Sequence, residues 1–338
     1  MGPAVRLAWA ALLALPVLVT AWSLVLTSAF LVEFLGQGRW RPLTALSPEP
    51  LVRPLAAPAS PAGPVAIDVY TRAAFLRPPG LVLVHGLSPS GKDDARLRDA
   101  ALLLARSGWA VAVPTVDGLT VLRLRPEDAG AVTASIHALR GAGYEHVALL
   151  GISLGAGPTL LAAADPTVAP SVSAVLALGG YASAVELLRY TLTGAYIYEG
   201  TTGRRPVLED AIAQFARANA ELVDEAGQRL VDNRDPMAVD GLVRALPERT
   251  RALLETLSPA RAVADIRAPL TLIHGRDDPA VPFTESLRLA AAARAAGRPV
   301  RVTIVGAVGH VEAGRLAGFA DLLQLWAAFY AFRRTAGG

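Results

Sequence analysis

The residue types best suited to chemistry stand together in the sequence Gly151-Ile152-Ser153-Leu154-Gly155. An apolar run typical of a buried strand precedes it, and an alanine- and leucine-rich run typical of a helix follows it. A sharp turn between a strand and a helix exposes a serine hydroxyl for nucleophilic attack. Flanking glycines let the strand and the helix approach each other. We therefore predict that Ser153 is a catalytic nucleophile.

A serine hydroxyl needs a base within hydrogen-bond reach. His310 is the candidate, because it lies in the short loop after the last predicted strand and before the last predicted helix. An imidazole there would lie over the carboxyl edge of a parallel sheet, as Ser153 does. His85 and His274 each end a strand before a glycine, and we expect them to hydrogen-bond loop backbone. The remaining histidines, expected to be structural, are His137 and His146.

A carboxylate should hold the imidazole in the correct tautomer and stabilise it once it is protonated. Asp277 and Asp278 both follow the predicted strand that ends in His274. By spacing alone, either carboxylate lies in the right loop.

These motifs together resemble the α/β-hydrolase superfamily over residues 65–332. The order Ser153, Asp278, His310 is the order of its catalytic triad. The sequence His85-Gly86-Leu87 resembles its oxyanion loop. The run His274-Gly275-x-x-Asp278-x-x-Val281-Pro282 is similar to the acid motif of many esterases, dienelactone-hydrolase-like proteins and prolyl oligopeptidase catalytic domains.

The resemblance implies an α/β-hydrolase fold, with a mostly parallel sheet, helices on both faces and an inserted helical cap. It implies Asp278 rather than Asp277 as the acid, and an oxyanion hole formed by the backbone N–H groups of Leu87 and Leu154. It calls for no cofactor and no metal. Dienelactone hydrolases use a cysteine nucleophile, and this chain has no cysteine, so that activity is not implied.

The elements that would position these residues alternate between short apolar runs and helical stretches, which indicates a parallel sheet covered by helices. We predict two core parts, 65–181 and 258–338, separated by a helical cap over 182–257 in which no strand is expected. The predicted strands are residues 65–70, 81–84, 110–113, 147–150, 172–178, 270–273 and 300–305.

The N-terminal part, residues 1–40, contains 26 consecutive uncharged residues at 7–32. About 20 apolar residues suffice to cross a bilayer, so we expect a single-pass membrane anchor. A cleaved signal peptide is the alternative, because Val19-Thr20-Ala21 has the small-residue spacing of a cleavage site. The arginines around the span lean toward a cytoplasmic domain. Residues 41–64 contain seven prolines and are predicted to be an extended linker.

Composition excludes several other functions. The formal net charge is only +3 and no basic run occurs, so nucleic acid is not an expected partner. The absence of cysteine excludes disulfides and thiolate metal sites. The sequence Lys92-Asp93-Asp94 has no glycine-rich cradle before it, and we interpret one of its aspartates as a helix N-cap.

The sequence thus predicts a membrane-anchored serine hydrolase that cleaves a small-molecule carboxylic ester through an acyl-enzyme. Three alternatives share the same residues: a peptidase, an acyltransferase, and a non-catalytic membrane-tethered binding protein of this fold. Fold alone does not choose between them.

Overall fold

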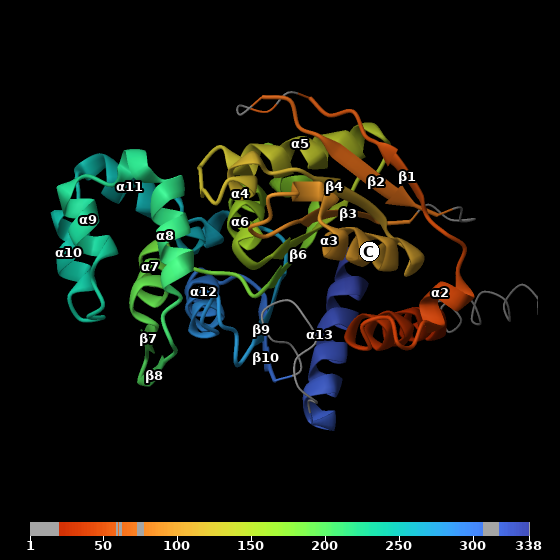
Figure 1. The fold of residues 1–338 in the computed structure, drawn as a ribbon. Coiled ribbons are helices and arrows are strands. Elements are labelled where there is room, and N and C mark those ends of the chain that lie inside the picture. The colour runs from red at the N-terminus through yellow and green to blue at the C-terminus, as the bar shows by residue number, and fades with distance from the viewer. Residues whose placement is uncertain (1–19, 59, 61–62, 73–77, 307–317, 338) are drawn as a thin grey trace, which may run out of the picture.

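The structure, a computed structural model, describes residues 20–58, 60, 63–72, 78–306 and 318–337. Within these residues an eight-stranded sheet has the order β1-β2-β4-β3-β5-β6-β9-β10 (Figure 1). β2 runs antiparallel to β1 and β4, and every other neighbouring pair is parallel. The strands are β1 (Leu51–Pro54), β2 (Ile67–Thr71), β3 (Gly80–Val84), β4 (Ala110–Pro114), β5 (Val147–Ile152), β6 (Val172–Leu178), β9 (Leu270–Gly275) and β10 (Val300–Val305).

The seven predicted strands are all present, with bounds that differ from the prediction by at most two residues. Apolar runs made them recognisable, because strands covered on both faces carry apolar side chains at successive positions. β3, β4 and β9 are buried at every residue. The α/β class with a mainly parallel sheet is therefore confirmed.

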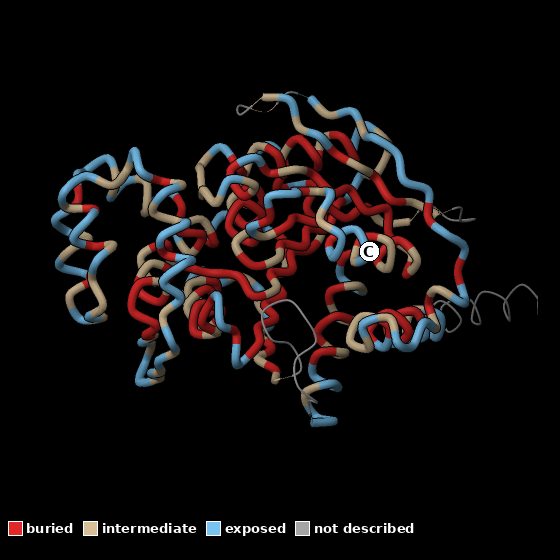
Figure 2. The backbone as a smooth tube through the Cα atoms, in the orientation of Figure 1, coloured by how far each residue is buried: buried red, intermediate tan, exposed pale blue. Residues whose placement is uncertain are grey.

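Two layers of helices cover the sheet, and Figure 2 shows the buried residues gathered between them. One face packs against α5 (Asp128–Gly141), α6 (Ala156–Ala164) and α12 (Thr284–Ala295). The opposite face packs against α3 (Ala95–Arg106), α13 (Phe319–Ala336) and a helix formed by residues 20–35. Successive side chains of each strand alternate between these two layers.

The helix of residues 20–35 overlaps the predicted membrane span and packs against the core of the fold. Leu26 and Phe30 are buried, and the Phe30 ring stacks on Phe329 of α13 with 4.6 Å between the ring centroids. Among the residues that the structure describes, no helix is both long enough and apolar enough to cross a membrane. Residues 7–19 of the predicted span lie outside the described residues, so the membrane anchor stays a prediction.

A buried carboxylate fixes the end of this helix. Glu33 accepts hydrogen bonds from the backbone N–H groups of Leu43 (3.0 Å) and Thr44 (2.9 Å), and from the Thr44 hydroxyl. Both residues belong to the short helix α2 (Pro42–Leu46), whose first-turn N–H groups have no partner within the helix itself. Glu33 thereby joins the two helices.

The expected extended linker at 41–64 is wrong over part of its length. It contains α2 and β1, and β1 pairs along its whole length with β2. Pro54, the proline within β1, is compatible with this pairing because β1 is the edge strand of the sheet. A missing N–H there disrupts no ladder between inner strands. Arg106 of α3 adds a hydrogen bond to the Ser47 carbonyl at 2.6 Å. This stretch therefore packs on the core.

The cap leaves the core after β6 and returns before β9 (Figure 1). It is mostly helical, as predicted, but the expectation that it contains no strand is wrong. β7 (Ala195–Tyr198) and β8 (Thr201–Arg204) form a hairpin. Its turn residues Glu199 and Gly200 both have positive φ, which matches a two-residue type I′ turn. The cap helices are α7 (Ala184–Thr193), α8 (Glu209–Ala218), α9 (Glu225–Val231), α10 (Val239–Ala245) and α11 (Glu248–Thr256), and the core also holds α4 (Asp117–Thr120).

Candidate active site

Ser153 stands on a strained turn between β5 and α6. Its φ is +53°, in the left-handed region that side chains other than glycine rarely adopt. Such a conformation costs about 1–2 kcal/mol per residue and persists where the surrounding structure enforces it. This backbone conformation places Ser153 in a sharp turn at the end of β5, as a nucleophile elbow requires.

The two glycines of the motif are sterically required. A Cβ added to Gly155 would stand 2.0 Å from the carbonyl oxygen of His85, at the end of the neighbouring strand β3. A Cβ on Gly151 would stand 2.7 Å from the Cα of Ala156, the first residue of α6. The predicted close approach of strand and helix is thus confirmed, and it extends to the loop after β3.

That loop, His85-Gly86-Leu87, lies directly against Ser153, the predicted nucleophile. A Cβ on Gly86 would stand 3.0 Å from the Ser153 Cβ and 3.5 Å from its Oγ. Leu87 directly follows Gly86, so its backbone lies close to Ser153. Leu154 directly follows Ser153 in the chain. These are the two residues whose N–H groups we predicted to form an oxyanion hole.

His85 holds this loop in place. Its Nε2 accepts a hydrogen bond from the Val116 backbone N–H at 2.9 Å, so its Nδ1 carries the proton and donates to the Gly86 carbonyl at 2.7 Å. Burial is the largest cause that lowers the pKa of His85, which favours this neutral form. The prediction that His85 bonds loop backbone is confirmed.

The loop after β9 contains the two candidate acids, and the structure separates them. The Asp278 side chain is fully buried, and its Oδ1 accepts hydrogen bonds from the N–H groups of Ala280 (2.8 Å) and Val281 (2.9 Å). The Asp277 side chain is 82% exposed and forms an ion pair with Arg205 at 3.0 Å. Of the two carboxylates, only Asp278 faces the interior.

His274 supports the same loop from below. Its Nε2 donates to the Val281 carbonyl at 3.0 Å and lies 3.5 Å from the Asp278 Oδ2, and its Nδ1 lies 2.7 Å from the Ser286 hydroxyl. As predicted, this histidine bonds loop backbone.

Tyr190 of the cap also holds the loop after β9, residues 276–283, which we name the acid loop; no sequence motif indicates this contact. Its hydroxyl donates to the Asp278 backbone carbonyl at 3.1 Å, and burial raises the pKa of Tyr190 to about 12. No motif links two residues 88 positions apart, so only the fold brings them together.

His310, the predicted base, lies outside the described residues. The described residues next to this segment are Gly306, which follows β10, and Gly318, which precedes α13. The Gly306 N–H donates to the Asp321 carboxylate of α13 at 2.9 Å. The end of β10 is therefore fastened to the first turn of α13.

Ser153 lines a cavity of about 1150 Å³, just above the ~300–1,000 Å³ typical of small-molecule sites. Pro279, Ala280 and Val281, which follow Asp278, line the same cavity, so Ser153 and the loop after β9 face one space. The other described walls come from the oxyanion loop, the cap, α3, α13 and the helix of residues 20–35.

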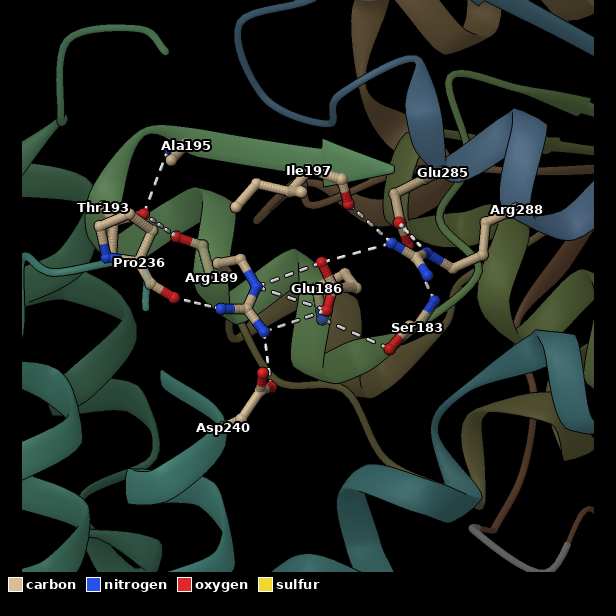
Figure 3. Close-up of polar contacts among 10 residues, drawn as sticks. All are labelled: Ser183, Glu186, Arg189, Thr193, Ala195, Ile197, Pro236, Asp240, Glu285 and Arg288. Carbon is tan, nitrogen blue, oxygen red and sulfur yellow. Dashed lines mark hydrogen bonds and ion pairs between the residues drawn. The ribbon is translucent and has the colours of Figure 1, made fainter. Parts of the chain in front are cut away.

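Charged side chains fasten the cap beside this cavity (Figure 3). The nearly buried Arg189 of α7 pairs with Glu186 at 3.2 Å, pairs with Asp240 of α10 at 2.6 Å, and donates to the Pro236 carbonyl. Pro236 and Asp240 lie 47 and 51 residues after Arg189 in the cap sequence. The Arg189 guanidinium therefore joins α7, the first helix of the cap, to α10 and the residues just before it.

The cap is joined to the core through Glu285 of α12 (Figure 3). Its carboxylate accepts hydrogen bonds from the N–H groups of Ala182 (3.0 Å) and Ser183 (2.8 Å), where the chain enters the cap, and pairs with Arg288 at 3.1 Å. Burial is the largest cause that raises the pKa of Glu285.

The Lys92-Asp93-Asp94 sequence is structural. The Asp94 carboxylate accepts hydrogen bonds from the N–H groups of Arg96 (3.0 Å) and Leu97 (3.4 Å), so the predicted N-cap of α3 is confirmed. Lys92 pairs with Asp68 of β2 at 2.8 Å.

Comparison with known proteins supports the same fold. Residues 243–333 match the sequence model of the prolyl oligopeptidase family. A comparison with curated protein sequences finds no significant match.

Solved structures with the same fold include the acylaminoacyl peptidase of Pyrococcus horikoshii (16% identity, TM-score 0.55, covering 85% of this chain) and a puromycin-hydrolysing peptidase of Mycobacterium tuberculosis (20%, 0.58, 87%). A putative dienelactone hydrolase from Klebsiella pneumoniae is also similar (13%, 0.52, 85%). This chain spans only 42% and 40% of the two peptidase chains, but 99% of the Klebsiella chain.

The features that this chain brings to the comparison are its sheet order, the positive φ of Ser153 after β5 and the cap inserted after β6. Together the comparisons show that the chain has the α/β-hydrolase fold, and its residues 243–333 resemble the prolyl oligopeptidase family.

Proposed function

We propose that this protein is a serine hydrolase that cleaves carboxylic esters of small, largely apolar molecules. Ser153 Oγ attacks the ester carbonyl while His310 takes its proton, and the N–H groups of Leu87 and Leu154 stabilise the oxyanion. The protonated His310 then gives its proton to the departing alcohol. Water releases the acyl group in the second half, and Asp278 orients the imidazole throughout.

The observation that carries the proposal is the strained Ser153 at the wall of a large apolar cavity. Beside the serine, the described walls are mostly leucine side chains from the oxyanion loop, the elbow and the cap. Such walls offer little hydrogen bonding to a peptide backbone, whereas they suit the hydrocarbon parts of an ester. The leucines that line the cavity from these three parts include Leu87, Leu154, Leu187 and Leu188.

A peptidase is the second candidate, and one observation favours it. Residues 243–333 match the prolyl oligopeptidase family, and several structures of similar fold are peptidases. The same triad can cleave an amide, provided that the leaving amine is protonated. Water is the acyl acceptor in both reactions, so the leaving group, an alcohol or an amine, decides between the two candidates.

The test compares matched substrates. We expect purified protein to hydrolyse p-nitrophenyl butyrate, and to hydrolyse aminoacyl and peptidyl p-nitroanilides far more slowly. Ser153→Ala protein serves as the control for both classes. Efficient cleavage of the anilides with little ester turnover would favour the peptidase.

A further inference from the structure

The cavity at Ser153 continues along one face of the sheet, beneath the helix of residues 20–35. Next to the elbow it is lined by Ile152 and Leu178, the last residues of β5 and β6. Both are half-buried and belong to the apolar cluster of that face. Successive side chains of a strand alternate between its two faces, so every second residue lines the same face. The wall therefore continues inward with other members of the same cluster. These inner members are Leu83, Leu150, Leu176 and Ile273.

Three helices close this part of the cavity, which we name the helix chamber. The helix of residues 20–35 contributes Phe30 and Phe34, and α13 contributes Leu325 and Phe329. α3 contributes Leu97, Ala100, Leu103 and Leu104. The stacking of Phe30 on Phe329 holds two of these helices together at the chamber wall.

Polar groups that line the chamber stand at its outer end and have partners or face solvent. Glu33 is engaged with the N–H groups of α2, and Arg106 donates to the Ser47 carbonyl. Arg41 and Asp99 are exposed. The inner part is therefore apolar, and an apolar cavity binds apolar ligands in preference to water.

We propose that the helix chamber binds a long hydrocarbon chain of the substrate ester, whose carbonyl stands at Ser153. This inference rests on the proposed ester hydrolysis and names its substrate class. The chamber lining is apolar and leads away from Ser153 along the sheet, so it suits the hydrocarbon chain of an ester. The cap side of the cavity remains available to the other part of the ester.

Filling the chamber should shorten the preferred chain. Ala100→Phe adds a ring to the α3 wall, and Ala95→Phe, on the exposed first residue of the same helix, is the matched control. The measurement is the kcat/KM ratio of p-nitrophenyl dodecanoate to p-nitrophenyl butyrate. We expect Ala100→Phe to lower this ratio at least about tenfold and Ala95→Phe to leave it at the wild-type value.

A second variant and a second substrate series complete the test. Phe34→Ala enlarges the chamber and should shift the preferred chain length upward, which covers the case in which Ala100→Phe does not fold. Dodecyl acetate and butyl acetate place the long chain on the alcohol side. A lowered ratio in either series supports the chamber and identifies which part of the ester occupies it.

Two results would overturn the inference. If Ala100→Phe and Phe34→Ala leave the ratios of both series at the wild-type value while esters are still hydrolysed, the chamber does not bind the chain. If wild-type protein hydrolyses no ester of any length, both the chamber and the proposed function are wrong.

Discussion

Gly86→Ala tests whether the loop after β3 forms part of the active site. Gly86 has no positive φ, so its backbone conformation accepts alanine. The new Cβ would stand 3.0 Å from the Ser153 Cβ, whereas ordinary contacts begin at 3.4 Å. Either the serine or the loop must therefore move by about 0.4 Å.

That displacement sets the expected effect. A misplacement of about 1 Å in a catalytic site costs roughly 100-fold in rate, so 0.4 Å scales to about five- to tenfold in kcat. The shift also separates the serine from the predicted oxyanion donors at Leu87 and Leu154. The cost in stability should be about 1 kcal/mol, the lower end for an overpacked site.

The assay combines steady-state hydrolysis of p-nitrophenyl butyrate with thermal unfolding. Gly141→Ala is the matched control, because Gly141 ends α5 and a Cβ there would meet nothing within 4 Å. It should retain full activity and gain up to about 1 kcal/mol of stability, since alanine is the better helix residue. Wild-type kcat in a folded Gly86→Ala variant would refute the contact between this loop and the nucleophile.

Three further predictions concern single residues. Ser153→Ala and Ser153→Gly should both abolish hydrolysis. The glycine variant should have a higher melting temperature than the alanine variant, because glycine adopts the positive φ without strain. Equal melting temperatures would count against strain at this residue. Asp278→Asn should lower kcat/KM by about 10³–10⁴-fold. Asp277→Asn should change kcat/KM less than about threefold, because the Asp277 side chain is 82% exposed. Reversed effects would identify Asp277 as the acid. Burial lowers the pKa of His85 below its unfolded value near 6.5, so its contribution to stability is complete above about pH 6.5 and is lost as pH falls through that value toward the folded pKa. The fall in unfolding free energy between pH 7 and pH 5 should be smaller in His85→Gln than in the wild type, and an unchanged fall in His85→Gln would contradict this.

The core of the fold could be predicted because its strands are buried on both faces. Runs such as residues 81–84 and 147–150 are continuously apolar, as expected of strands that are buried on both faces. Ser153 could be predicted because its turn needs glycine at fixed positions. Clashes at Gly151 and Gly155 now give the physical reason.

The parts that could not be predicted depend on tertiary contacts. β1 contains a proline and is exposed, so only its pairing with β2 makes it a strand. The apolar run that ends at Val32 has the pattern of a membrane span, yet its described part packs on α13. An apolar run does not show whether its side chains contact lipid or protein, so the sequence alone could not predict this packing. The bond from Tyr190 to the acid loop joins the cap to the core and leaves no mark on local sequence.

The most direct test of the account is covalent labelling of the nucleophile. A fluorophosphonate reacts with an activated serine, and peptide mapping by mass spectrometry locates the adduct. We predict one adduct per chain, on the peptide that contains Ser153, with labelling and p-nitrophenyl butyrate hydrolysis lost in parallel and neither detectable in Ser153→Ala. An adduct on another residue, or hydrolysis that persists in a folded Ser153→Ala protein, would contradict the assignment of this serine as the nucleophile.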